Sequence, residues 1–187
     1  RKPVAAPATV GLARLLRNLD RAREALVWLD QAEGLTDSAA AQLERAQCLL
    51  QTQQVAQAGP VAEQVLQMTT AGASAPGLVG EGEGGGVRAE AHMVAAEACA
   101  VGYRPEEALW HLVQAIREGG PRERLTYRIV GLCSHQPLSE TAVVNALQQL
   151  YATGFRDAAL GVADALVARP GFGRLKGWAM ERAAQDR

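Results

Sequence analysis

The sequence predicts an all-α protein built from antiparallel helix hairpins, and three observations lead to this fold class. The 187 residues are 48% hydrophobic but only 4% aromatic, and alanine, leucine, glutamine, glutamate and arginine, which favour helices, dominate the chain. Apolar residues recur every three or four positions, which is the period of an amphipathic helix. One phrase also occurs twice, as REALVWLDQAEG at 23–34 and PEEALWHLVQAI at 105–116, and internal repeats of this kind are typical of stacked hairpins.

The first two predicted hairpins lie at about 8–33 and 37–69. In the first hairpin an apolar stripe marks each helix, and Asp20 is placed to cap the second one. The second hairpin opens on a cluster of capping residues that ends at Ser38. We predict that its second helix starts at about Pro60, because proline suits a first helical turn and disrupts a helix interior.

Residues 70–86 are rich in glycine and carry no apolar stripe. We therefore predict a long flexible loop there, between two helices. After it, prolines fall at the junctions between helical segments, where they interrupt no helix. The remaining predicted elements are a hairpin at 87–118, an extra helix without a partner at 122–134, a hairpin at 138–168 and a C-terminal helix at 173–185, which makes about nine or ten helices in a single domain over 1–187.

Charge and cysteine content narrow the class of protein. The net charge of −1 creates no field that attracts nucleic acid or an anionic membrane, and no apolar run is long enough for a transmembrane helix. Cys48, Cys99 and Cys133 are odd in number and widely spaced, which indicates a reducing, cytoplasmic environment rather than a disulfide framework. The excess of arginine over lysine suggests a GC-rich bacterial genome. Because the chain starts on Arg1, we expect it to be a piece of a longer protein.

Small residues lie where the two helices of each hairpin should touch, with larger apolar residues at set offsets. The small positions are Ala13, Ala25, Ala46, Ala62, Ala95, Ala108, Ala159 and Ala163. This pattern, and the offset of about 33 residues between Ala13 and Ala46, resemble the tetratricopeptide repeat (TPR) family, whose period is 34. The resemblance implies a right-handed superhelical array of hairpins, an α-solenoid, in which the first helix of each hairpin lines a concave groove that binds peptides or helices of partners.

The same resemblance assigns positions in that groove. They are Arg14, Arg17, Gln47, Leu50, Gln51, His92, Val144, Gln148 and Tyr151. One subgroup of the family holds a peptide's terminal carboxylate with paired lysine and asparagine; this chain has neither at those places, so we do not expect that binding mode. Arg14 and Arg17 share a helical face and would suit an acidic segment. Alternatively they form a solvated face that contributes little to stability.

No arrangement of residues predicts an enzyme. Cys133 and His135 form the closest Cys/His pair, but a structural zinc site needs four ligands, and a buried thiol beside a capping histidine accounts for the pair. His92 and His111 each stand alone within a helix. The glycine run lacks the Lys-Ser/Thr of a phosphate-binding loop. We therefore expect no catalytic residue, no metal and no cofactor.

Two functional hypotheses follow. The first is a cytoplasmic scaffold or adaptor, a protein-protein interaction module that binds a protein or peptide partner and itself binds neither nucleic acid nor membrane. The alternative is a ligand- or partner-sensing regulatory region of a larger bacterial transcription factor or signalling ATPase. The sequence predicts no particular oligomeric state.

Overall fold

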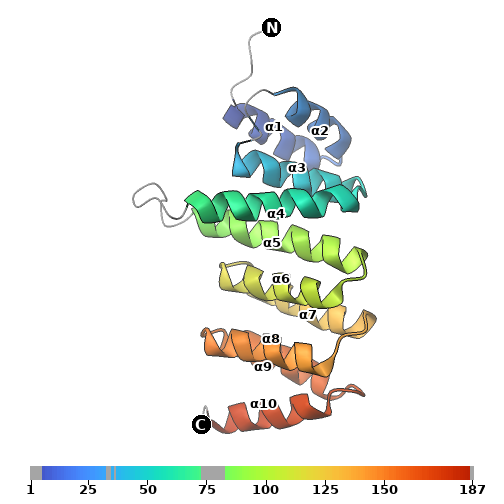
Figure 1. Cartoon of the computed structure of the whole chain (residues 1–187), viewed down its shortest axis with the longest axis vertical. Coiled ribbons are helices and arrows are strands. Elements are labelled where there is room, and N and C mark those ends of the chain that lie inside the picture. Colours follow the sequence, from blue (N-terminus) through green and yellow to red (C-terminus); the bar gives the residue numbers. More distant parts are fainter. Residues whose placement is uncertain (1–5, 33–34, 36, 73–82, 186–187) are drawn as a thin grey trace.

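The computed structural model describes residues 6–32, 35, 37–72 and 83–185. Within these ranges the chain forms ten α-helices and no β-strand, which confirms the all-α prediction. The helices follow one another along the long axis of the molecule, from α1 at one end to α10 at the other (Figure 1). Their bounds are α1 (Ala6–Asn18), α2 (Ala22–Gln31), α3 (Ala39–Gln51), α4 (Val55–Gly72), α5 (Glu83–Val101), α6 (Pro105–Arg117), α7 (Arg122–His135), α8 (Glu140–Ala152), α9 (Arg156–Val167) and α10 (Gly173–Gln185).

Neighbouring helices pack in pairs, and the pairs pack on one another. In the N-terminal part α1 pairs with α2, α3 with α4 and α5 with α6, while α3 also contacts α1 and α5. Further along, α8 pairs with α9 and packs on α6, and α7 packs on both α6 and α9. The helix that the sequence left without a partner is therefore an integral member of the stack. No helix in the described ranges has both the length and the apolar character that crossing a membrane requires.

The backbone repeats at the turns between paired helices. One residue in each turn has a positive φ: Asp20 (59°), Gln53 (62°), Tyr103 (57°) and Gly154 (92°). The N–H group of the next residue then donates to a carbonyl five residues back, as from Arg21 to Leu16, Gln54 to Leu49, Arg104 to Cys99 and Phe155 to Leu150. This is the hydrogen bond of a Schellman cap, which ends a helix and turns the chain back.

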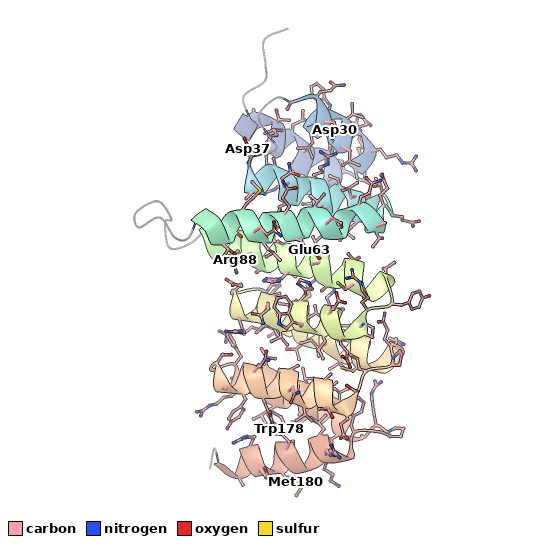
Figure 2. All side chains as sticks on the ribbon, in the orientation of Figure 1. Asp30, Asp37, Glu63, Arg88, Trp178 and Met180 are labelled. Carbon is pink, nitrogen blue, oxygen red and sulfur yellow. The ribbon has the colours of Figure 1, made fainter. Side chains whose placement is uncertain are left out.

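The alanines assigned to the helix contacts are buried. Ala25, Ala46, Ala62, Ala108 and Ala159 all have 0% exposure, and a methyl side chain lets two helix axes approach closely. Around them the apolar core divides into three clusters, one within α1–α3, a second within α3–α5 and a third that runs from α5 to α10. At the end of the third, Trp178 turns into the stack while Met180 lies on the outer side of α10 (Figure 2).

The predicted start of the fourth helix is wrong. The helix α4 begins at Val55, so Pro60 lies inside it. Proline has no N–H group to donate to the carbonyl of Ala56, and its ring crowds that carbonyl. Pro60 is exposed, so the unpaired carbonyl faces the solvent side, while Ala58 and Ala62 on the other side are fully buried. Packing of that buried face holds the helix together across the proline.

The loop predicted at 70–86 is also wrong at both of its ends. The helix α4 continues to Gly72 and α5 begins at Glu83, so 70–72 and 83–86 are helical; the rest of the predicted loop lies outside the described residues. Glycine costs about 1 kcal/mol relative to alanine within a helix, which is why the sequence favoured a loop. The next turn of the α5 helix buries Ala89 and packs Val87 against the core cluster of α3–α5. This packing offsets the cost of the glycines, so the helix begins before them.

Candidate functional site

An open groove of about 650 Å³ crosses one face of the stack. We call it the odd-helix groove because α1, α3, α5 and α7, with the turns beside them, supply its lining. Its lining residues are Arg17, Asn18, Asp20, Gln47, Leu50, Gln51, Glu90, Met93, Val94, Glu97, Pro121, Arg124 and Arg128. One continuous surface thus takes side chains from successive hairpins.

Polar side chains connect the helices that line this groove. Gln51 donates from Nε2 to Asp20 at 2.8 Å, which joins α3 to the turn after α1. Gln47 donates from Nε2 to Glu90 of α5 at 2.9 Å. An ion pair of 2.7 Å joins Arg128 to Glu97. Carboxylates therefore lie on the α1 and α5 parts of the groove, while arginine side chains line its α7 side.

The two arginines predicted to receive an acidic partner already bind an acid of the chain itself. Glu44 of α3 is 1% exposed. Its Oε1 accepts from Arg14 Nε at 2.6 Å and its Oε2 accepts from Arg17 Nε at 3.0 Å. The hydrogen bond from Arg14 to Glu44 raises the pKa of the Arg14 guanidinium. A buried carboxylate needs such donors, because leaving it unpaired in the interior costs several kcal/mol, about 3–5 when one partner of a buried pair is removed. The arginines are therefore structural and do not form the solvated face that the sequence left open.

Arg14 is not part of the groove lining, and the other predicted groove residues separate into three places. Arg17, Gln47, Leu50 and Gln51 line the odd-helix groove. His92 does not, because it is 4% exposed and faces a different hollow. Val144, Gln148 and Tyr151 lie on α8, outside the lining of the groove. There Tyr151 packs edge-on against Trp178 of α10, with the guanidinium groups of Arg156 and Arg182 over its ring.

The sequence interpretation chose the wrong face of α5 and missed the contribution of α7. On α5, Glu90, Val94 and Glu97 are spaced by four and three residues, which places them on one helical face. His92 is two residues from Glu90, about 200° around the helix, so it points away from that face. On α7, Arg124 and Arg128 are four apart. This spacing was visible in the sequence, but the interpretation of α7 as a helix without a partner removed it from consideration.

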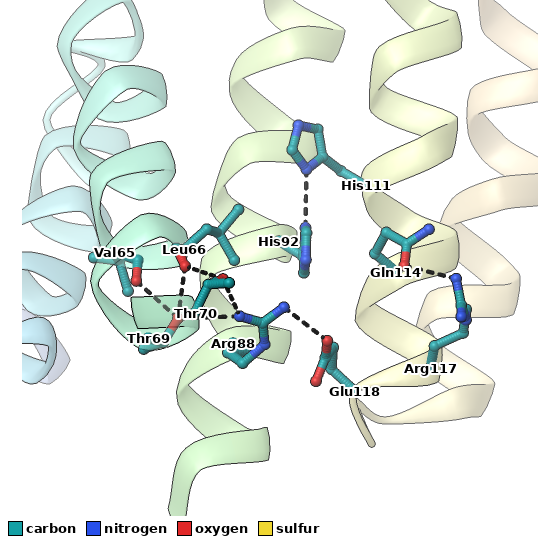
Figure 3. A network of polar contacts seen from close by, with 10 residues as sticks. All are labelled: Val65, Leu66, Thr69, Thr70, Arg88, His92, His111, Gln114, Arg117 and Glu118. Atoms are coloured by element: carbon teal, nitrogen blue, oxygen red, sulfur yellow. Dashed lines mark hydrogen bonds and ion pairs between the residues drawn. The ribbon is translucent and has the colours of Figure 1, made fainter. Parts of the chain in front are cut away.

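A second concave site lies between α4, α5 and α6. It is open to solvent, has a volume of about 620 Å³ and is lined by Leu66, Gln67, Thr70, Arg88, His92, Trp110 and Gln114; we call it the α4–α6 hollow. Figure 3 shows its polar network. Nδ1 of His92 lies 3.0 Å from Nδ1 of His111, so one ring donates and the other accepts. The two histidines that looked isolated in the sequence are therefore hydrogen-bonded partners.

Burial keeps this histidine pair neutral. Loss of solvent, with the neighbouring His111 as a second cause, lowers the pKa of His92 to about 4. Burial also lowers the pKa of His111. Trp110 closes the outer side of the pair, with its ring edge-on to both imidazoles at centroid distances of 5.6 and 4.8 Å. An N–H···N hydrogen bond between two imidazoles requires at least one of them to be neutral, and the local environment meets that condition.

The cysteines carry no sign of reactivity. Cys48, Cys99 and Cys133 are free and buried, and burial raises the pKa of the Cys48 and Cys133 thiols to about 11. A thiol of this kind is protonated near neutral pH and is a poor nucleophile. In the described ranges no three histidine, cysteine or acidic side chains converge as a metal site would require.

Comparison with known proteins finds no matching family model, no matching curated protein and no matching solved structure. Inferences about function therefore depend on the geometry of the chain itself.

Proposed function

We propose that the chain is a non-enzymatic interaction module, a TPR-like scaffold or adaptor that binds an extended segment of a partner protein in the odd-helix groove. The observation that carries this proposal is the lining of the groove by four alternate helices, α1, α3, α5 and α7. An extended segment that lies across these helices contacts several hairpins at once. The recurring hairpin turns and the buried alanine contacts support a repeat array with the right-handed superhelical arrangement that the resemblance implies.

The charges in the groove suggest a partner segment of mixed charge. Asp20 and Glu90 lie on the α1 and α5 sides and suit a lysine or arginine of the partner. Arg124 on α7 is exposed and suits an aspartate or glutamate. Arg14 and Arg17 hold Glu44. An acidic residue of the partner would therefore bind Arg124, on the opposite side of the groove. Charge complementarity of this kind acts mainly on the rate of association and on specificity.

Site-specific photo-crosslinking tests the proposal. A photo-reactive amino acid at Leu50, which lines the groove, should crosslink a protein partner in cells. The same group at Gln57, which is exposed on α4 and outside the groove, should not capture that partner. Equal capture from both positions would mean that the groove is not the binding surface.

A charge reversal refines the assignment. Arg124→Glu should slow association with the captured partner, and the difference should shrink at high salt. Arg23→Glu is the matched control, because Arg23 is exposed on α2 and outside the groove. An equal loss of association rate in both variants would indicate a general effect of charge rather than a contact at Arg124.

The alternative function, a ligand-sensing regulatory region of a larger protein, is favoured by one observation only. The α4–α6 hollow has the size of a small-molecule site, since such sites measure roughly 300–1,000 Å³. Activity assays of the full-length protein with and without small organic acids would separate this role from a purely structural scaffold.

A further inference from the structure

The α4–α6 hollow and the odd-helix groove use opposite sides of α5. Arg88 and His92 line the hollow, whereas Glu90 and Val94 line the groove. The side chains of residues two apart are rotated by about 200° around the helix axis, so they lie on nearly opposite sides of the helix. A ligand in the hollow therefore makes its contacts independently of any partner segment in the groove.

The lining of the hollow combines an apolar wall with hydrogen-bond donors. Leu66 and Trp110 supply the apolar part, and Trp110 is 49% exposed. The guanidinium of Arg88 and the side-chain amides of Gln67 and Gln114 supply the donors. Among the residues that the structure describes, no carboxylate belongs to this lining, in contrast to the groove, where Asp20, Glu90 and Glu97 do. A negatively charged ligand therefore meets the Arg88 guanidinium in this lining, while the one carboxylate bonded to Arg88, that of Glu118, is not part of it.

The charged donor, Arg88, is held in place before any ligand arrives. Arg88 donates from Nη1 to the Thr70 hydroxyl at 2.8 Å and from Nη2 to Glu118 at 3.0 Å, which ties together α4, α5 and the end of α6 (Figure 3). A guanidinium has five N–H groups, so donors remain after these bonds. His92 uses Nδ1 for His111, and its Nε2, on the far side of the ring, carries the proton in the tautomer where His111 is the donor. Groups that are already ordered lose less entropy on binding.

We propose that the α4–α6 hollow binds a small organic carboxylate with a planar aromatic body. The aromatic ring packs against Trp110 and Leu66, where ring pairs prefer offset or edge-on contact. The carboxylate accepts hydrogen bonds from Arg88 and from the Gln114 amide, and bonds to an ionised acceptor are the stronger kind. Glu118 compensates part of the Arg88 charge, so the dissociation constant should be modest, on the order of 0.1–1 mM.

Nuclear magnetic resonance of the tryptophan indole N–H signals tests this proposal with phenylacetate as the probe. Trp110 should give a saturable shift, while Trp28 on α2 and Trp178 on α10 lie outside the hollow and should stay unchanged. Phenylacetamide has the same shape without the charge and should bind roughly tenfold more weakly, which corresponds to about one charge-assisted hydrogen bond. Equal affinity for acid and amide, or no saturable shift of Trp110 at millimolar phenylacetate, would overturn the proposal.

Three substitutions, one of them a control, distinguish a lost contact in the hollow from a folding defect. Gln114→Glu adds a carboxylate to the lining and keeps the contact with Arg117, which now donates to Gln114 at 3.0 Å, so the protein should fold. It should weaken phenylacetate binding by roughly tenfold or more and leave phenylacetamide binding unchanged. Arg88→Met should abolish the preference for the acid, whereas Arg104→Met, at the opposite end of the α5–α6 hairpin and paired with Glu107, should preserve it. Unaltered phenylacetate binding in Gln114→Glu would refute the assignment.

Discussion

The N-terminal and C-terminal halves of the stack are held together by different interactions. The two core clusters within α1–α5 are small, and alanine is their commonest residue. The cluster that runs from α5 to α10 is continuous, and leucine is its commonest residue. Four of the five buried polar residues of the described ranges also belong to α1–α5: they are Thr9, Gln42, Glu44 and His92, and the fifth, His111, is on α6.

This difference predicts that the two halves of the stack differ in stability. Large aliphatic side chains bury more apolar surface per residue, and each Å² of buried apolar surface stabilises the fold by about 25 cal/mol. We therefore expect α6–α10 to form the more stable part. Alanine contacts and hydrogen-bonded polar groups such as Glu44 and the His92–His111 pair give less energy but a defined geometry. Both concave sites draw most of their lining from α1–α5. The half that presents the candidate sites is therefore the one with the weaker apolar core.

The largest effect is expected from a cavity in the C-terminal cluster. Leu147 is fully buried in α8, so Leu147→Ala should lower the free energy of unfolding by about 3–4 kcal/mol. Leu49→Ala, in the smaller cluster, should cost about 2 kcal/mol, at the low end of the same range. Met180→Ala on the exposed side of α10 is the control. Urea unfolding monitored by circular dichroism measures all three, and a larger loss at Leu49 would reverse the proposed order of stability.

Overpacking at the alanine contacts should come next. Ala25 and Ala108 are both fully buried at helix contacts, and Ala25→Leu or Ala108→Leu should cost about 1–3 kcal/mol because the helices must separate. Ala56→Leu, at an exposed position of α4, serves as the control. Unchanged denaturant midpoints for both buried substitutions would show that these alanines are not close contacts between helices.

The buried carboxylate of the N-terminal half allows a graded test. Arg17→Met leaves Glu44 with only one donor and should cost about 2 kcal/mol. Arg14 is 57% exposed, so water can take over part of its contact with Glu44 when the side chain is removed. Arg14→Met should therefore lower the free energy of unfolding by about 1 kcal/mol at most. Chemical denaturation of the two variants at neutral pH compares them. Equal and negligible losses would mean that solvent, not these arginines, stabilises the Glu44 carboxylate.

Stability should also fall in acid because of the histidine pair. The folded-state pKa of His92 is about 4, below the ordinary value near 6.5, so between these values the unfolded chain binds a proton that the folded chain does not. Stability is therefore lost as the pH falls through about 6.5 towards 4, by about 1–2 kcal/mol between pH 7 and pH 5. Denaturation across this range should show a shallower slope for His92→Gln than for the parent. His135→Gln, at an exposed position, should keep the parental slope, and identical slopes in all three proteins would contradict the prediction.

The smallest expected effect is a gain in stability at a hairpin turn. Gln53 adopts a φ of 62°, a conformation that costs a residue with a β-carbon roughly 1 kcal/mol and costs glycine nothing. Gln53→Gly should raise the free energy of unfolding by about 0.5–1 kcal/mol. Gln57→Gly, within the exposed first turn of α4, should lower it by a similar amount. Thermal melts of both variants would show whether the turn is strained.

Local sequence signals accounted for most of the helices because they act within one or two turns. The positions of the apolar residues placed the hairpins, and Ser38 caps α3 through a hydrogen bond from the Ala41 N–H group at 3.4 Å, as the cluster of capping residues predicted. The same local logic failed at Pro60 and at Gly86, where packing of the rest of the helix outweighs an unfavourable residue. A propensity of about 1 kcal/mol per glycine is small beside the energy of a buried helix face.

The sequence by itself determined the all-α class, the hairpins and the alanine contacts, because a period of 3.6 residues and the lack of a bulky side chain are properties of each segment alone. Only the tertiary structure decided that Glu44 lies between Arg14 and Arg17, that His92 pairs with His111 and that α7 completes a groove. Each of these depends on which faces of separate helices meet. A shift of one or two residues along a helix turns a side chain by about 100° or 200°, so periodicity identifies a buried stripe but does not determine which side chains meet across it.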